Sequence, residues 1–198
     1  MPTGLAYRDG TCEPNRRFNL AVETRIVMDA LEAIHTRRSI RKYLDKPVPE
    51  ELIQKLLAAA MQAPSACNQQ PWQFVVIDDR TILAEIPKFM PNAAMAGKAP
   101  LAILVCGDVD LRVERSEGYW VVDCAAAVEN MLLAAHALGL GAVWCGVYPR
   151  EPRMEGMRRL LGLPKNVIAH SLVVLGYPGE QVPPEDRHRP ERVRRNRW

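Results

Sequence analysis

The chain has 198 residues, of which 48% are hydrophobic and 25% are charged, and this composition is typical of one compact globular domain. Its longest apolar stretches, such as residues 101–106, are strand-sized, which excludes a transmembrane helix of about 20 apolar residues. The formal net charge of +3 is unevenly distributed, because residues 187–198 hold six arginines against one glutamate and the remainder therefore sums to −2. Such a body lacks the basic face that binds a nucleic-acid backbone, so we expect no nucleic-acid partner.

Residues 1–27 precede the first periodic helix and are mixed polar with proline, glycine and arginine. We expect them to form an N-terminal extension that is partly disordered, ahead of a single domain over residues 28–198. The segment lacks the apolar centre of a signal peptide, which favours a cytoplasmic location. The cysteines are widely spaced and form no C-x-x-C pair, so we expect free thiols rather than disulfides or metal ligands. They are Cys12, Cys67, Cys106, Cys124 and Cys145.

Helical and strand-like spacings alternate along the chain. Residues 29–35 carry apolar side chains at helical spacing, and a second helix begins near Pro49, with proline in its first turn and two carboxylates near its positive end. Ala63-Pro64-Ser65 ends that helix. Apolar runs bounded by turn residues predict strands. They cover residues 72–77, 101–107, 141–147 and 167–176.

The longest predicted helix covers residues 119–138. It is rich in alanine and nearly free of charge, so it must be buried on several sides, by its own sheet and by a second subunit. A shorter helix at residues 151–161 precedes the last strand, and residues 176–198 have the proline and arginine content of an extended tail without a core. The order of these elements predicts an α+β fold with a small central sheet flanked by helices.

Four cations and a serine stand together directly after the first predicted helix, in Arg37-Arg38-Ser39-Ile40-Arg41-Lys42. The planar guanidinium of arginine offers two parallel N–H groups to phosphate oxygens, and serine adds a short donor. This chemistry favours a phosphate site. A basic turn that is only solvated has the same composition, so the segment alone leaves both interpretations open.

A polar loop, Pro64-Ser65-Ala66-Cys67-Asn68-Gln69-Gln70-Pro71, leads directly into the strand at residues 72–77. Asparagine and glutamine amides present a donor and an acceptor together, which matches the alternating nitrogen and oxygen edge of a flavin or purine ring. The alternative is a connection whose side chains satisfy its own backbone. Cys67 in this loop is either a thiol with a redox role or a small packing residue.

The segment Gly139-Leu140-Gly141-Ala142-Val143-Trp144-Cys145-Gly146 has only part of the glycine spacing of a dinucleotide-binding turn. Trp144 stands at the position of the third glycine, and the turn runs from helix to strand rather than from strand to helix. We therefore exclude a Rossmann site. Gly146, at the end of the predicted strand, allows a close approach between the backbone and a flat ligand.

Taken together, R-R-S-x-R, then P-S-x-x-N-x-Q-P-W, then an alanine-rich helix ending in G-L-G resemble the FMN-dependent nitroreductase family over about residues 29–193. The resemblance implies a mostly antiparallel central sheet and an intertwined homodimer, with FMN in a cleft at the subunit interface. Both subunits contribute to each cleft in that family. The cofactors implied are FMN and, as electron donor, NADH or NADPH.

Carried over to this sequence, the family's flavin contacts fall into four groups. The group on the phosphate and ribityl chain consists of Arg37, Arg38, Ser39 and Arg41, to which the tail adds Arg187. The group that reaches the flavin from the opposite subunit consists of Pro64, Ser65, Ala66 and Asn68, with Gln70 in support. The main-chain amide of Cys145, with Gly146 beside it, approaches flavin N5, and Asn92 reaches the pyrimidine edge of the ring.

The resemblance also implies a ping-pong mechanism in which the protein supplies no side-chain catalyst. Hydride passes from NADH or NADPH to flavin N5, the nucleotide leaves, and a small electrophilic acceptor such as a nitroaromatic compound or a quinone takes its place. Two alternatives remain. A specialised branch of the same fold fragments flavin or dehalogenates aromatic substrates, and a non-catalytic relative would only bind flavin. No metal and no membrane partner is expected.

Overall fold

The computed structural model describes residues 28–111 and 116–198, so the predicted extension at residues 1–27 lies outside the described residues. Within this part of the chain, four strands form a sheet in the order β1-β2-β4-β3, and each neighbouring pair is antiparallel. The strands are β1 (Trp72–Ile77), β2 (Leu101–Asp108), β3 (Gly141–Gly146) and β4 (Val167–Gly176). This arrangement confirms the predicted α+β class and the mostly antiparallel sheet.

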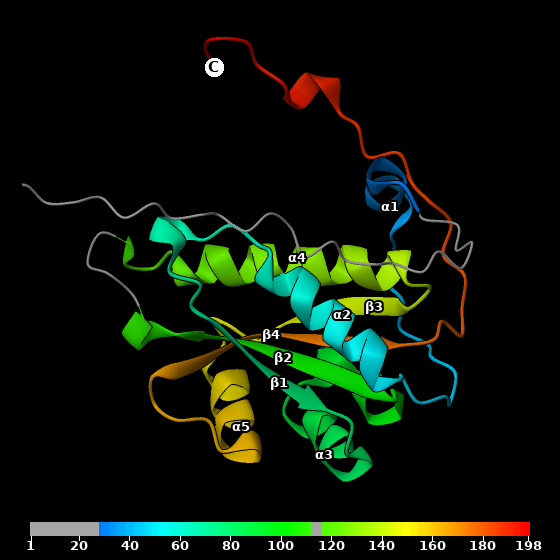
Figure 1. Cartoon of the computed structure of the whole chain (residues 1–198), viewed down its shortest axis with the longest axis vertical. Helices are drawn as coiled ribbons and strands as arrows, with labels where there is room; N and C mark the ends of the chain where they lie inside the picture. Colours follow the sequence, from blue (N-terminus) through cyan, green and yellow to red (C-terminus); the bar gives the residue numbers. More distant parts are fainter. Residues whose placement is uncertain (1–27, 112–115) are drawn as a thin grey trace, which may run out of the picture.

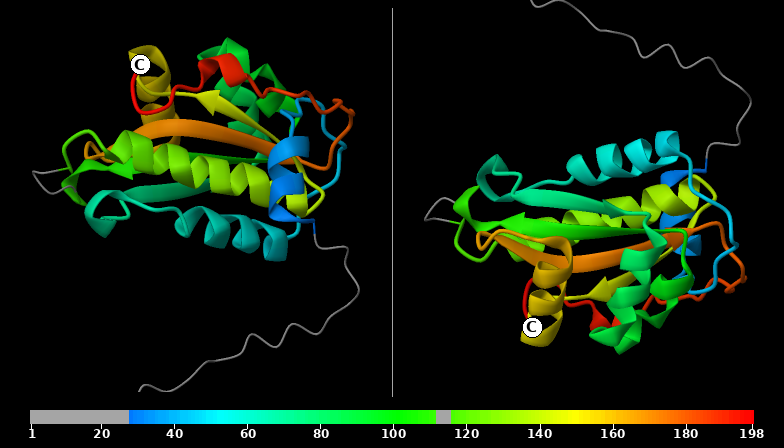
Figure 2. Two further views of the ribbon diagram at one scale, coloured as in Figure 1. Left: turned by 90° about the horizontal axis from the view of Figure 1, so that it is seen from above. Right: turned by 90° about the horizontal axis from the view of Figure 1, so that it is seen from below.

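Helices cover both faces of the sheet (Figure 1, Figure 2). On one face lie α2 (Glu50–Met61) and α4 (Trp120–Ala137), with α1 (Ala30–Thr36) at the C-terminal end of α4. On the other face lie α3 (Arg80–Glu85) and α5 (Glu151–Leu161). The short 3₁₀ helices are η1 (Ala66–Asn68), η2 (Ile86–Lys88), η3 (Pro91–Lys98), η4 (Val109–Leu111) and η6 (Pro190–Arg192).

The strand β2, one of the two inner strands of the described sheet, contributes side chains to the hydrophobic cores on both faces. Leu101, Ile103 and Val105 belong to the core under α2 and α4, whereas Ala102 and Leu104 belong to the core under α3 and α5. Because both faces are covered, this strand carries no polar side chain from Leu101 to Gly107, rather than alternating between apolar and polar residues. The pattern is common where a strand lies between two layers of helices.

The long helix α4 has two unlike faces. Its inward face is fully buried and includes Cys124, Val128 and Met131. Its outward face carries Val122, which is 61% exposed, and the partly exposed Ala126. One chain alone therefore leaves part of this apolar helix uncovered. Among the described residues, neither α4 nor any other helix is long and apolar enough to cross a membrane.

The chain after β4 is an extended tail. All residues of the segment 181–198 are exposed, and η6 is its one helical turn. Figure 1 shows this segment, coloured from orange to red, passing α1 and then projecting away from the body. The tail therefore buries little apolar surface against its own chain.

Candidate functional site

The cation segment, residues 37–42, lies along the outer edge of β3. Ser39 forms a parallel bridge with Ala142, and the Ile40 N–H donates to the Ala142 carbonyl at 3.0 Å. This approach requires glycine at position 141, because a Cβ there would lie 2.7 Å from the Ile40 side chain. At about 3.3 Å per residue, Cys145 lies about 10 Å further along the strand. The cation segment and the end of β3 therefore share one edge of the sheet.

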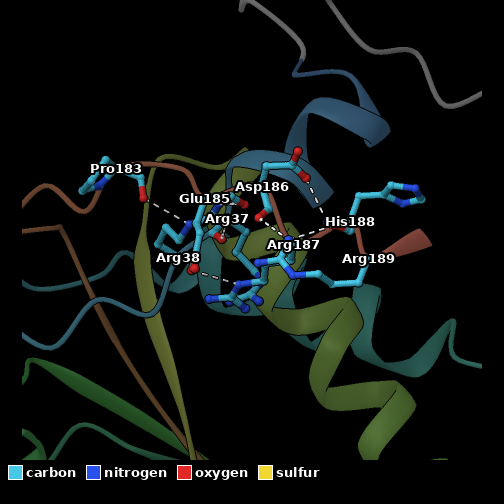
Figure 3. Close-up of polar contacts among 8 residues, drawn as sticks. All are labelled: Arg37, Arg38, Pro183, Glu185, Asp186, Arg187, His188 and Arg189. Atoms are coloured by element: carbon cyan, nitrogen blue, oxygen red, sulfur yellow. Dashed lines mark hydrogen bonds and ion pairs between the residues drawn. The ribbon is translucent and has the colours of Figure 1, made fainter. Parts of the chain in front are cut away.

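Arg37 and Arg38 take different partners although they are neighbours. Arg37 Nε lies 3.6 Å from Glu129 Oε1 on α4, in an ion pair. Arg38 turns to the tail, where its Nε donates to the Pro183 carbonyl at 3.2 Å and its Nη2 donates to the Glu185 carbonyl at 2.9 Å (Figure 3). The structure therefore separates two arginines that the sequence pattern placed in one group.

The main chain of Arg41 is held by a hydrogen bond, and its side-chain charge acts on the Cys145 thiol near the end of β3. Its N–H donates to Glu180 Oε1 at 2.7 Å, and this bond is the first cause of the lowered pKa of Glu180. Burial raises the pKa of the Cys145 thiol, while the guanidinium groups of Arg41 and Arg153 oppose that rise. Positive charge therefore acts on the segment that contains Cys145.

Gly146 ends β3 and faces open space. A Cβ built on Gly146 would meet no heavy atom within 4 Å. Trp144, which lies on the same face of the strand, is 36% exposed. The missing side chain at Gly146 therefore leaves room for a flat ligand against the backbone, with an indole ring beside it.

A cavity of about 660 Å³ opens beside the cation segment. Its walls come from α1, the C-terminal half of α4, the start of β3 and the tail, and Arg37, Arg38 and Glu180 are among its polar residues. The Thr36 hydroxyl lies 2.8 Å from His136 Nε2 in the same wall. Burial, together with the charges of Arg37 and Arg38, lowers the pKa of His136. His136 is therefore a hydrogen-bonded helix residue with a preference for its neutral form.

The polar loop between α2 and β1 has an unusual backbone conformation. Cys67, Asn68 and Gln70 have φ angles of 52°, 53° and 51°. This left-handed region costs a non-glycine residue about 1–3 kcal/mol, so surrounding contacts must hold it in place. The Ser65 hydroxyl accepts the Gln70 N–H at 2.9 Å, and Gln70 Nε2 donates to Asn68 Oδ1 at 3.0 Å. Three of the predicted loop residues thus hold one another in position.

Asp123 fixes the loop to the N-terminal end of α4. It is only 4% exposed, and its Oδ1 accepts the main-chain N–H of Ala66 at 3.0 Å. Its Oδ2 has no hydrogen-bond partner within the described residues, and neither has Gln69 Nε2, although Gln69 Oε1 accepts the Ser116 hydroxyl at 2.6 Å. Asp123 is not among the site residues predicted from the sequence. The available signal was a carboxylate in the first turn of a helix with few charged residues.

The two main groups of predicted flavin contacts lie at opposite ends of α4 (Figure 1). The loop reaches α4 at Asp123 and α1 reaches it at His136, which are about 20 Å apart at 1.5 Å per residue. Ser65 and Ala66 line a second, apolar hollow of about 240 Å³ with Val122, separate from the cavity beside the cation segment. One chain therefore does not bring the two groups together.

The two remaining predicted contacts are Asn92 and Arg187, and of these only Arg187 lies near the cation segment (Figure 3). Asn92 is exposed near the start of η3, whose buried residues pack in the core under α3 and α5. In the described chain, no hydrogen bond joins it to another predicted site residue. Arg187 lies in the exposed tail, where its Nε is 3.3 Å from Glu185 Oε2 (Figure 3).

A buried histidine lies among aromatic rings close to the end of β3. The centroid of the His170 ring lies 6.0 Å from that of Trp120, 6.2 Å from that of Trp144 and 6.4 Å from that of Tyr148. Burial lowers the pKa of His170 to about 4, and its Nδ1 lies 2.9 Å from the Ser171 hydroxyl. His170 therefore packs as a neutral ring. Within residues 28–111 and 116–198, no three histidine, cysteine or acidic side chains are grouped so that they could hold a metal ion.

Comparison with known proteins identifies the family to which this architecture belongs. The model of the nitroreductase family matches residues 34–91 and 88–177. A protein of Methanothermobacter thermautotrophicus, provisionally named NADH dehydrogenase/NAD(P)H nitroreductase, is 54% identical over 171 residues, which cover 86% of this chain and 88% of the relative. The chain therefore belongs to the nitroreductase family.

Solved structures agree with this assignment. A protein of Parabacteroides distasonis, also provisionally named NADH dehydrogenase/NAD(P)H nitroreductase, has a TM-score of 0.81 at 40% identity and covers 85% of this chain and 98% of its own. A protein of Desulfovibrio desulfuricans, provisionally described as a nitroreductase in complex with FMN, has a TM-score of 0.71 at 33% identity, with coverages of 85% and 97%.

Proposed function

We propose that this protein is an FMN-dependent oxidoreductase that takes hydride from NADH or NADPH and reduces small electrophilic compounds such as nitroaromatics or quinones. Family membership and the names of the relatives support an NAD(P)H-dependent oxidoreductase, and the Desulfovibrio neighbour is described with FMN. The observation that carries the proposal is the pairing of Ser39 with Ala142. It places a cation cluster and an open stretch of backbone at Gly146 on one edge of the sheet.

The residues present fit FMN at both of its ends. Arg37 and Ser39 suit the terminal phosphate, because a guanidinium fork and a hydroxyl match phosphate oxygens. The distance along β3 from Ala142, which pairs with Ser39, to Gly146 is about 13 Å at about 3.3 Å per residue, and it suits the extended ribityl chain. The space beside Gly146 suits the flat ring, since a side chain there would fill it. One bound flavin would thus contact features that lie far apart in the sequence.

When bound, FMN supplies the hydride chemistry at N5, and the protein supplies position and charge. Backbone groups alternate in direction along a strand, and Ala142 turns its carbonyl to the outer edge of β3. Gly146, four residues further on, turns its backbone to the same edge, which favours its N–H over that of Cys145 as the donor at the ring. The positive charge of Arg41, which acts on the Cys145 segment, would stabilise negative charge on a flavin held there.

The active unit that we propose is a cytoplasmic homodimer. The cation segment and the polar loop lie about 20 Å apart along α4, so a second copy must supply the loop at each flavin. The uncovered face of α4 next to that loop supports the same arrangement. The cysteines of the described residues are unpaired, which supports a reducing compartment.

The proposal is tested by releasing the cofactor from the purified protein and by measuring turnover. We expect FMN on chromatography, and NADH or NADPH oxidation that depends on an added quinone with the parallel double-reciprocal lines of a ping-pong mechanism. Recovery of FAD, or a protein that takes up no FMN, contradicts the cofactor assignment. Flavin binding without NAD(P)H oxidation points to a non-catalytic flavin protein instead.

A further inference from the structure

The first part of the tail is bound to the cation segment through the main chain. The Leu44 N–H donates to the Tyr177 carbonyl at 2.9 Å, and the Gly179 N–H donates to the Lys42 carbonyl at 2.8 Å. The Glu180 carboxylate then accepts two main-chain N–H groups of the cation segment, at 2.7 and 3.1 Å. Up to Glu180 the path of the tail is therefore set by main-chain hydrogen bonds and by the Glu180 carboxylate.

Beyond Glu180 the described tail keeps its polar contacts with the body through one side chain, Arg38. Its Nε donates to the Pro183 carbonyl at 3.2 Å and its Nη2 to the Glu185 carbonyl at 2.9 Å (Figure 3). Its Nη1 donates to the Arg37 carbonyl at 2.5 Å, at the residue that caps the C-terminus of α1. The Arg38 side chain thus joins the end of a helix to two points of an exposed segment.

This geometry uses the property that distinguishes arginine from lysine. A guanidinium holds its N–H donors in a rigid fork, so three carbonyls in different directions can be bound at once. Each of the three nitrogens of Arg38 already faces a carbonyl. By contrast, Arg37 lies 3.6 Å from a single carboxylate oxygen, and it is the better placed of the two to turn to an added anion.

We propose that Arg38 is a positioning residue that fixes the point at which the C-terminal tail leaves the body, and so sets the place of Arg187. Arg187 follows Glu185 by two residues, and the two side chains form an ion pair. In this arrangement Arg38 acts on a bound phosphate through the tail, whereas the family resemblance implied that it contacts the phosphate directly. The anchoring does not depend on the proposed function. The effect on phosphate rests on the proposed function, because it requires bound FMN.

The anchor is tested on flavin-free protein with an endoprotease that cleaves after glutamate. Cleavage after Glu185 reports release of the anchored segment, and cleavage after Glu191, further along the tail, is the internal reference. Arg38→Ala is expected to raise the rate at Glu185 relative to Glu191 about tenfold, because charge-assisted bonds to the tail are lost. Arg38→Lys keeps the charge and loses the fork, and Arg37→Ala is the control. A raised ratio in either Arg38 variant supports the anchor, and an unchanged ratio in both overturns it.

The effect on phosphate is tested with a double-mutant cycle on FMN affinity. If Arg38 acts by positioning Arg187, Arg38→Ala weakens FMN binding in the natural protein but changes it by less than about twofold in an Arg187→Ala background. Additive losses, or no loss in Arg38→Ala, overturn the positioning role. If the natural protein binds no FMN, the proposed function has failed, and the proteolysis result stands on its own.

Discussion

Gly146 is the residue at which we propose that the flat ring lies. A Cβ there meets nothing within 4 Å, and the residue is not in the left-handed region. Gly146→Val should therefore change the free energy of unfolding of the flavin-free protein by less than about 0.5 kcal/mol. It should weaken FMN and riboflavin binding alike by at least about tenfold, because the side chain fills the space of the ring. Thermal unfolding measures the stability and flavin titration measures the affinity, with Gly97→Ala as the control. An undiminished flavin affinity would show that the ring lies elsewhere.

Arg37 allows the phosphate end of the site to be tested separately from the ring. Arg37→Ala removes a charge-assisted bond, which should weaken FMN binding about ten- to hundredfold. Riboflavin has the ring and ribityl chain but no phosphate, so its affinity should change by less than about threefold. Glu129→Gln is the matched control, since it removes the ion-pair partner and leaves the arginine. Equal losses of FMN and riboflavin affinity would indicate that the cation segment is only a solvated basic turn.

His170 predicts how stability depends on pH. Its pKa is lowered to about 4 by burial, whereas an exposed histidine titrates near 6.5. Between these values the unfolded chain binds a proton that the folded chain does not, so the free energy of unfolding falls as the pH falls. The full effect is at most about 3 kcal/mol. Urea unfolding at several pH values should show a shallower decline for His170→Phe than for the natural protein, and parallel declines would refute this assignment.

The polar loop is the element whose conformation depends most on one distant side chain. Asp123→Ala removes the acceptor of the Ala66 N–H and should release the strained residues that follow. Because the loop is proposed to contact the ring, FMN and riboflavin affinity should fall together by about tenfold. Asp123→Asn keeps an oxygen for that N–H and should recover most of the affinity. If the asparagine variant binds flavin no better than the alanine variant, the main-chain contact is not what matters.

The bounds of elements with a clear helical or strand-like spacing of apolar residues could be predicted from the sequence. The predicted ranges 72–77, 151–161 and 167–176 coincide with β1, α5 and β4. No predicted element corresponds to α3, η2 or η3. These short helices follow one another between Arg80 and Lys98, with Pro87 and Pro91 among them, so no window is long enough to show a helical repeat.

The types of residue that form the site could be predicted from the sequence. Which of them contact one another could not. The basic segment and the polar loop stand out locally, since each gathers unusual side chains within a few residues. The contact between Arg38 and Glu185 joins residues 147 positions apart, and the contact between Ala66 and Asp123 joins residues 57 apart. Such contacts depend on how the elements pack, which no local pattern records. The individual flavin contacts remain predictions.

At the scale of the whole molecule, the outward face of α4 and the exposed tail predict a two-fold dimer. We expect an interface well above about 2,000 Å² in total, as in stable homodimers. Light scattering should report a dimer for the flavin-loaded protein. Val122→Lys, on the uncovered face, should weaken it, whereas Val76→Lys, at an exposed position on β1, should not. A flavin-loaded monomer would contradict this prediction.

The length of α4 has a consequence for how such a dimer takes up its flavins. One end of the helix supports the cation segment and the other supports the polar loop, and in the proposed dimer these serve different flavins. The first flavin to bind would hold the segments at the two ends of this helix in place, so the second would bind with a smaller loss of conformational entropy. Uptake would then be cooperative, with empty and doubly loaded dimers dominating over half-loaded ones.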